Sequence, residues 1–386
     1  MIKNQRHLFD IPDDVAYLNC AYMSPLMTAV QEAGRDGIAD KGRPWMLSPP
    51  DFFSRSWDCR SLFADLINAP AENVAIVPSA SYGLAVAARN LKLEPGREII
   101  ILEDQFPSNV YVWRELAAQY GGTVRTVLKS EAARYDNEGL DWTAAMLDAI
   151  TERTAIVAAA NCHWTDGALI DVERIAERTR DAGAALVLDI TQSGGAWPFD
   201  AARVRPDFLI CACYKWLMGP YSLGFLYVDP KWHGGEPLEY NWIARRRSED
   251  FGGLVDYEDS YQDGALRFDM GERSNFHLMP MAAAALGQLL EWGVDEIAAT
   301  LSAGTAAIAD RAKALGLSAS PPHLRAGHFL GLRFPSGIPD GLLARLAEDR
   351  IYVSVRGDSM RITPHLYNTQ EDVERLFAAL EREVRA

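Results

Sequence analysis

Residues 185–220 have the sequence ALVLDITQSGGAWPFDAARVRPDFLICACYKWLMGP, which contains two apolar strands that each lead to a charged side chain. The first predicted strand, residues 185–189, ends at Asp189, and the second, residues 208–212, is followed by Lys215. Continuously apolar strands are typical of a parallel sheet that helices cover on both faces. Because ligands bind at the carboxyl ends of such strands, we expect Asp189 and Lys215 to lie at one edge of the sheet.

Strand-like and helix-like segments alternate on both sides of this stretch. Gly121-Gly122 and Gly183 follow predicted helices and indicate where those helices end. The sequence therefore predicts an α/β fold with a mainly parallel seven-stranded sheet. The predicted strands are residues 74–77, 99–102, 124–128, 155–160, 185–189, 208–212 and 224–228, and the predicted helices between them are 82–91, 110–120, 141–150 and 172–182.

The pattern changes after the last of these strands. Residues 232–267 are irregular and rich in aromatic and acidic residues, and a chain of 386 residues is too long for one ordinary core. We expect a large domain at residues 15–270, a linking helix at 275–292 and a small α+β domain at 293–386, on which residues 1–14 pack. The elements expected in the small domain are helices at 295–315, at 341–349 and from 370 onward, and a strand at 351–355.

Charge and composition exclude several kinds of partner. The formal net charge of −15 argues against a nucleic-acid partner, which requires a basic surface. The longest apolar runs fall well short of the ~18 residues that a membrane span needs. The five cysteines form no C-x-x-C pair, and the first 17 residues contain no signal-peptide core. We therefore expect a reduced, cytoplasmic protein with neither a membrane partner nor a metal site.

An acid, a lysine and an amide follow three of the predicted strands. They are Asp189, Lys215 and Asn161. Pyridoxal phosphate requires a lysine for its imine and a carboxylate that keeps its pyridine nitrogen protonated. Carboxylates also cap ordinary turns, and most lysines are solvated. Lys215 differs from those because an apolar strand precedes it and the apolar residues 216–220 follow it, which favours a functional lysine.

The sequence resembles the class V aminotransferase family of fold-type I pyridoxal-phosphate enzymes, which includes cysteine desulfurases, kynureninases and isopenicillin-N-epimerase-like proteins. The resemblance covers nearly the whole chain, from YLNCAYMSPL at residues 17–26 to RITPHLYNT at residues 361–369. Its most specific part is the D-x-x-Q of residues 189–192, followed by Y-K at 214–215. The resemblance implies the fold-type I architecture, a homodimer, bound pyridoxal 5'-phosphate, and an α-amino-acid substrate that reacts through an external aldimine.

The resemblance also implies roles for single residues. Lys215 corresponds to the Schiff-base lysine and proton shuttle, and Asp189 to the partner of the pyridine nitrogen. Gln192 corresponds to the amide that bonds the cofactor's phenolic oxygen, and Phe106 to the aromatic ring that stacks on the cofactor in kynureninases. Arg361 corresponds to the arginine whose planar fork binds the substrate carboxylate.

The implied phosphate site lies at the start of a predicted helix, where free backbone amides favour anions. It consists of the amide of Ala80, the hydroxyl of Ser81 and the side chain of Tyr214. Ser274 or Arg273 is expected to reach the phosphate of the partner subunit, because Glu272 stands where the family has threonine and an acid would repel the phosphate.

Further implied contacts involve the substrate pocket. Asn161 is expected to contact the cofactor or substrate, and Asn19 and His163 to face the substrate. A satisfied, neutral histidine is an equally good interpretation of His163. Arg356 is either a second anion contact or a member of a surface ion pair.

The absence of a cysteine from the predicted small domain narrows the range of possible reactions. A persulfide-forming desulfurase needs a cysteine in the small domain, and the sequence has none after Cys213. A transaminase or a C–C or C–S lyase is favoured, and a kynureninase-like hydrolase or an isopenicillin-N-epimerase-like epimerase is the alternative. A nucleotide-binding protein is disfavoured because neither G-x-G-x-x-G nor G-x-x-x-x-G-K occurs after a strand.

Overall fold

The computed structural model describes residues 1–385, and its central feature is a seven-stranded sheet with the strand order β2-β8-β7-β6-β5-β3-β4. β8 is antiparallel to both of its neighbours, and the other adjacent strands are parallel. The predicted mainly parallel sheet is therefore confirmed, and each predicted strand overlaps an observed one. The strands are β2 Val74–Val77, β3 Glu98–Leu102, β4 Thr123–Val127, β5 Thr154–Ala159, β6 Ala185–Asp189, β7 Phe208–Ala212 and β8 Gly224–Val228.

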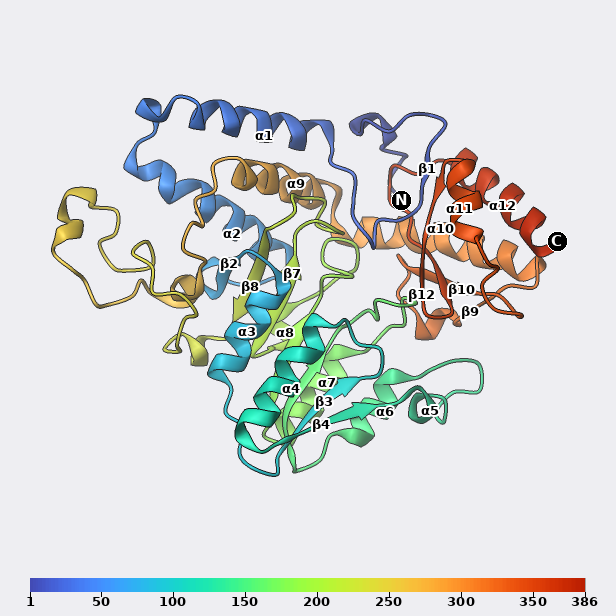
Figure 1. The fold of residues 1–386 in the computed structure, drawn as a ribbon, viewed down its shortest axis with the longest axis horizontal. Helices are drawn as coiled ribbons and strands as arrows, with labels where there is room; N and C mark the ends of the chain where they lie inside the picture. Colours follow the sequence, from blue (N-terminus) through green and yellow to red (C-terminus); the bar gives the residue numbers. More distant parts are fainter. Residues whose placement is uncertain (386) are drawn as a thin grey trace.

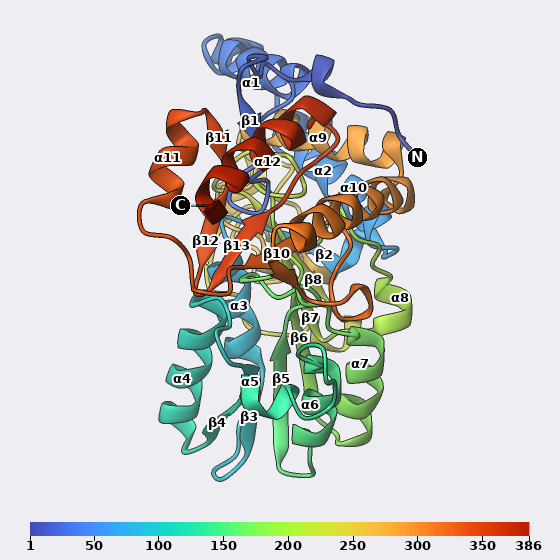
Figure 2. The ribbon, with the colours of Figure 1, turned by 90° about the vertical axis from the view of Figure 1, so that its right-hand side faces the viewer.

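Helices cover both faces of this sheet. They are α1 Thr28–Lys41, α2 Ser54–Leu66, α3 Ala80–Asn90, α4 Ser108–Tyr120, α5 Lys129–Ala132, α6 Trp142–Ala149, α7 Val172–Asp181, α8 Ala201–Val204 and α9 Leu278–Trp292. Side chains alternate along β3, so Ile99 and Ile101 pack with α3 and α4, whereas Ile100 and Leu102 belong to the core beneath α2, α6, α7 and α9. Figure 2 shows α4 and α7 on opposite sides of the strands. Burial on both faces explains why these strands are continuously apolar.

The C-terminal residues form a second, smaller sheet with the order β12-β13-β10-β9, in which all neighbours are antiparallel. It has its own core, which includes Leu330, Met360 and Phe377. Figure 1 shows this part, in orange and red, on the opposite side of the molecule from the yellow excursion of residues 232–267. Its elements are α10 Val294–Ala314, β9 Ser318–Ala319, β10 Leu330–Arg333, α11 Leu342–Glu348, β12 Ser354–Arg356, β13 Ser359–Ile362 and α12 Gln370–Arg385.

The strand predicted at residues 351–355 is two strands that belong to different sheets. β11 (Ile351–Tyr352) pairs in parallel with β1 (Ala16–Tyr17), whereas β12 pairs with β13. The N-terminal residues also contact this part of the chain, because Arg6 forms an ion pair with Asp372 at 3.1 Å. The sequence does not indicate that β1, near the N-terminus, pairs with the first residues of the predicted strand. The domain boundaries at residues 15, 270 and 293 stay predictions.

Helices α1 and α2 were not predicted, and for α1 the buried positions explain why. The buried residues of α1 are Val30, Gly34 and Gly37, because the helix packs closely against α9. A Cβ at Gly34 would lie 2.8 Å from Sδ of Met281 on α9. Small residues replace the apolar stripe that usually marks an amphipathic helix.

The described residues also bear on membrane insertion, metal binding and cysteine pairing. Within residues 1–385, no helix is long and apolar enough to cross a membrane, and no group of three or more histidine, cysteine, aspartate or glutamate side chains is arranged to hold a metal ion. All five cysteines are unpaired and buried. They belong to the packing of the interior, as small apolar side chains do.

Gly83 allows α3 to lie close to the sheet, because a Cβ at this position would lie 2.9 Å from Cγ1 of Ile210 on β7. We expect Gly83→Ala to lower the free energy of unfolding by about 1–3 kcal/mol, since the extra methyl group overpacks this contact. Denaturant unfolding measures the change. Gly287→Ala in α9 is the matched control, because a Cβ there meets nothing within 4 Å among the described residues. It should raise the free energy of unfolding by roughly 0.5–1 kcal/mol, and equal effects of the two substitutions would contradict the close contact.

Candidate active site

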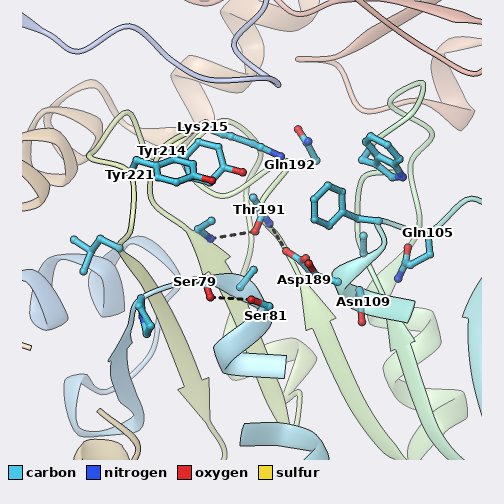
Figure 3. Close-up of a pocket in the computed structure, with 18 of the residues that line it drawn as sticks. Ser79, Ser81, Gln105, Asn109, Asp189, Thr191, Gln192, Tyr214, Lys215 and Tyr221 are labelled. Carbon is cyan, nitrogen blue, oxygen red and sulfur yellow. Dashed lines mark hydrogen bonds between the residues drawn. The ribbon is translucent and has the colours of Figure 1, made fainter. Parts of the chain in front are cut away.

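A cavity of about 260 Å³ lies at the carboxyl edge of the seven-stranded sheet (Figure 3). Its walls come from the segments that follow β3, β5, β6 and β7 and from the N-terminus of α3. The chain proceeds from β3 to β4 in one direction along the sheet and from β5 to β7 in the other. Ligands of open α/β sheets bind at such a reversal of strand order.

The amine of Lys215 is buried in this cavity between two aromatic rings. Its Nζ lies 5.4 Å from the ring centroid of Phe106 and 5.5 Å from that of Tyr214, and the residue is 6% exposed. Burial lowers the pKa of Lys215 from 10.5 to about 8; the carboxyl of Asp189 opposes this change and the charge of Arg361 adds to it. At pH 7 roughly a tenth of this amine is therefore neutral and nucleophilic, far more than for a lysine in water.

Asp189 ends β6 with a buried carboxylate. Its Oδ1 accepts a hydrogen bond from the backbone N–H of Thr191 at 2.9 Å, yet burial raises the pKa of the Asp189 carboxyl above its usual value. The hydroxyl of Thr191 accepts from the backbone N–H of Ala212 at 3.0 Å, which ties the ends of β6 and β7 together. Asp189 forms no ion pair with a lysine or arginine of residues 1–385, so a cationic group in the cavity would find it free.

The N-terminus of α3 offers donors to an anion. Ser79 caps this helix through a hydrogen bond from the N–H of Tyr82 at 3.2 Å, and its Oγ lies 2.9 Å from that of Ser81. The backbone N–H groups of Ala80 and Ser81 have no partner within the described chain, and both residues line the cavity. Figure 3 shows Ser79 and Ser81 at this helix end. Free amides and hydroxyls at the positive end of a helix suit a phosphate group.

Gln192 is held in place from three directions. Its Oε1 accepts from Nε1 of Trp216 at 3.1 Å, and its Nε2 donates to the carbonyl of Ala21 at 3.2 Å. The backbone carbonyl of Gln192 pairs with Nε2 of His328 at 2.7 Å, which requires the proton on Nε2 because a carbonyl can only accept. Burial lowers the pKa of His328 to about 4, so this imidazole is neutral.

Arg361 on β13 is a buried guanidinium without a carboxylate partner in residues 1–385. Its Nε and Nη2 donate to Oγ of Ser354 at 2.9 and 2.6 Å, and its Nη1 donates to the carbonyl of Trp164 at 3.0 Å. Ser354 donates in turn to Oδ1 of Asn19 at 2.8 Å. Burial lowers the pKa of Arg361 to about 9, and its charge affects Lys215. A buried cation of this kind suits a substrate carboxylate.

Asn161 and His163 do not line the cavity. Ala160, Cys162 and Trp164 line the cavity in their place, so the lining residues alternate with Asn161 and His163 along the chain. Asn161 accepts a hydrogen bond from Ser193, at 2.5 Å. The ring nitrogens of His163 lie within hydrogen-bond distance of the Thr165 hydroxyl and the Glu103 carbonyl. Neither of these residues, which were expected to contact cofactor or substrate, lines the cavity, and the satisfied, neutral histidine is the better interpretation of His163.

Three other predicted residues, Asn19, Ser274 and Arg361, also lie outside the cavity lining. Asn19 contacts Ser354 and so reaches the site through Arg361. Ser274 donates to the carbonyl of Phe52 and lines a different cavity, together with Phe276 and neighbouring residues. Seven predicted residues do line the one cavity: Ala80, Ser81, Phe106, Asp189, Gln192, Tyr214 and Lys215.

Some cavity residues were not predicted. Ser79 had a signal in the sequence, because it precedes a predicted helix as a cap. Tyr221, whose ring centroid lies 4.6 Å from that of Tyr214, had none. Asn109 accepts from Nε1 of Trp113 at 2.8 Å, which leaves its Nδ2 buried and without a partner in the described chain. Asn109 is one of the residues that line the cavity, and a buried donor without a partner is uncommon in a folded protein.

The lowered pKa of Lys215 can be measured on the ligand-free protein. Only the neutral amine reacts with acetic anhydride, so labelling of Lys215 should rise with pH through a midpoint near 8. Peptide mass spectrometry measures the extent of labelling at each pH. Lys129 is an internal control, because its hydrogen bond to Asp104 raises its pKa above 10.5. If Lys215 were labelled only at the pH that Lys129 requires, its desolvation would be contradicted.

Comparison with known proteins gives a consistent result. The chain matches the model of the family described as aminotransferase class-V over residues 50–376. The uncharacterized aminotransferase YcbU of Bacillus subtilis is 26% identical over 360 residues, which cover 92% of this chain and 89% of that protein. Isopenicillin N epimerase of Streptomyces clavuligerus is 25% identical over 359 residues, 86% of this chain and 87% of the epimerase.

The fold matches a solved structure as well. A cysteine desulfurase from Thermococcus onnurineus NA1 superposes with a TM-score of 0.83 at 20% identity, over 100% of this chain and 99% of the desulfurase. At that identity the superposition shows the fold alone, which is fold type I. Together with the family match, it shows that the chain belongs to the class V aminotransferases, a family of pyridoxal-phosphate-dependent enzymes.

Proposed function

We propose that this enzyme acts on an α-amino acid, and that Lys215 both carries the cofactor covalently and moves the proton of the substrate's Cα. The reaction we favour is that of a transaminase or a C–C or C–S lyase. The observation that carries the proposal is the buried amine of Lys215, whose pKa is lowered to about 8. A base with a pKa near the working pH is an efficient proton carrier.

The cavity fits pyridoxal phosphate. Asp189, a buried carboxylate with no cation of its own, would hold the protonated pyridine nitrogen. The free amides of Ala80 and Ser81 and the hydroxyl of Ser81 would hold the phosphate. Phe106 and Tyr214 supply aromatic surfaces beside Lys215. When bound, the cofactor accepts the electron pair that a broken Cα bond leaves behind.

Lys215 is the cavity-lining group of the described chain whose pKa is lowered toward neutrality, which suits it to act as the base. Burial raises the pKa of Tyr214 to about 12, so its phenol stays protonated at neutral pH. Burial likewise raises the pKa of the Cys162 thiol, which therefore does not ionise. Asp189 is engaged with the pyridine nitrogen in this proposal. Proton removal and return would thus both belong to Lys215.

Arg361 would orient the substrate. Two parallel hydrogen bonds from its guanidinium to the α-carboxylate fix the rotation of Cα, and this decides which bond of Cα stands toward Lys215. Ser354 and Asn19 hold the guanidinium from behind. They act as positioning residues, and they explain why one N-terminal and two C-terminal segments meet here.

The surroundings of Phe106 favour a one-base reaction. The residues that line the cavity near it in sequence are Gln105, Ser108 and Asn109, none of which ionises near neutral pH. An epimerase that protonates the second face of Cα with a second base would require such a group. The missing cysteine after Cys213 likewise disfavours a persulfide-forming desulfurase. We also propose a homodimer in which Ser274 approaches the partner subunit's phosphate.

Exchange of the Cα proton tests the role of Lys215. Holoenzyme in D₂O should exchange the Cα proton of its amino-acid substrate for deuterium. Proton NMR measures this exchange for each amino acid of a panel. Lys215→Ala should slow the exchange by about 10²–10⁴-fold, because a positioned general base contributes that much. Lys129→Ala, which removes a lysine paired with Asp104, is the matched control and should exchange normally.

The products of the same reactions identify the chemistry. A 2-oxo acid with retention of nitrogen on the enzyme indicates transamination, and pyruvate with sulfide indicates a C–S lyase. A D-amino acid would replace the proposal by epimerisation, and anthranilate from kynurenine would replace it by hydrolysis. Undiminished exchange in Lys215→Ala would refute the proposed base.

A further inference from the structure

Arg356, at the end of β12, is a partly buried guanidinium that no carboxylate of residues 1–385 neutralises. Its Nη1 donates to the carbonyl of the adjacent Val355 at 2.7 Å, and its Cζ lies 5.6 Å from the ring centroid of Trp164. Arg333, on β10 two strands away in the same sheet, is by contrast paired with Asp166 at 2.6 Å and Asp358 at 3.5 Å. Arg356 therefore differs from an ordinary surface arginine with an acidic partner.

Trp164 connects Arg356 to the cavity. It is one of the cavity-lining residues, and its ring meets that of Phe106 edge-on, with the centroids 5.3 Å apart and the planes at 88°. Its Nε1 donates to the carbonyl of Asp104 at 2.5 Å, and its own carbonyl accepts from Arg361. The indole is thus held through its Nε1 and the main chain of Trp164 through its carbonyl, with Arg356 over the ring and Phe106 nearly perpendicular to it.

With a simple amino acid bound, one cation of the site, Arg356, would have no counter-ion. In the proposed function, Arg361 binds the α-carboxylate and Asp189 binds the pyridine nitrogen. Arg356 then remains as a cation near enough to lower the pKa of both Lys215 and Arg361. A guanidinium beside an aromatic ring is a good receptor for a carboxylate, which it can bind through two parallel hydrogen bonds.

We propose that the preferred substrate is an α-amino acid with a second carboxylate in its side chain, and that Arg356 and Trp164 select it. The inference rests on the proposed function, because it assumes that Arg361 holds the α-carboxylate. The side chain of the substrate would extend along Trp164 toward Arg356. Neutral amino acids of the same shape would leave Arg356 without a counter-ion and would bind less tightly.

Equilibrium binding tests the inference without turnover. Succinate and glutarate have two carboxylates and no amine, and their mono-amides, succinamate and glutaramate, keep the shape and lose one charge. Calorimetric titration of the holoenzyme should show about tenfold tighter binding of at least one diacid than of its mono-amide. In Arg356→Gln the ratio should fall to near one, and Arg356→Lys should restore part of it because it restores the charge.

A matched control separates a local contact from general charge. Arg345→Gln removes one positive charge from the same C-terminal part, at an exposed arginine paired with Glu383. It should leave the preference for the diacid intact. Equal affinity of the wild-type holoenzyme for each diacid and its mono-amide would overturn the inference, and so would an equal loss in Arg345→Gln and Arg356→Gln.

Turnover distinguishes this inference from the proposed function. The kcat/KM for L-glutamate or L-aspartate should exceed that for L-glutamine or L-asparagine, and Arg356→Gln should collapse the ratio. If amino acids react without such a preference, the proposed function stands and the inference fails. If no amino acid reacts while diacids still bind through Arg356, the proposed function fails and the anion site stands.

Discussion

Burial of one amine and one carboxylate at the ends of neighbouring strands is the constraint on which the rest of the site depends. Removing Lys215 from water disfavours its charged form, and a change of its pKa from 10.5 to about 8 corresponds to roughly 3 kcal/mol. The same burial raises the pKa of Asp189. Neither group neutralises the other in a direct ion pair, so both remain available to a ligand. A packed sheet with strand ends tied by Thr191 makes this arrangement possible.

The site also depends on contacts between segments that are far apart in the sequence. Asn19 and Arg361 meet at Ser354, and β1 pairs with β11 a few residues away. The loop that follows Lys215 has positive φ at Met218 (56°) and Ser222 (63°), conformations that cost about 1–3 kcal/mol each. Stability gained in the sheet is thus offset at the cavity, as is common where backbone strain positions functional groups.

The sequence predicted the seven-stranded sheet because burial on both faces requires continuously apolar strands. It predicted Lys215, Asp189 and Gln192 because polar residues at strand ends are conspicuous and the family resemblance gave them roles. Prediction from the sequence failed where the result depends on the direction in which a side chain points or on tertiary contacts. Asn161 and His163 follow the correct strand, yet alternation turns both away from the cavity. α1 was missed because glycines, rather than apolar side chains, form its buried face. How residues 351–355 divide into strands depends on the pairing of residues 351–352 with β1, which the local sequence does not predict.

The central claim is that Lys215 is the residue that carries pyridoxal phosphate. The most direct measurement is reduction of the holoenzyme with borohydride, which makes an imine permanent, followed by digestion and mass spectrometry of the peptides. We expect the pyridoxyl group on Lys215 and on no other lysine. Modification of a different lysine, or none after incubation with the cofactor, would contradict the account.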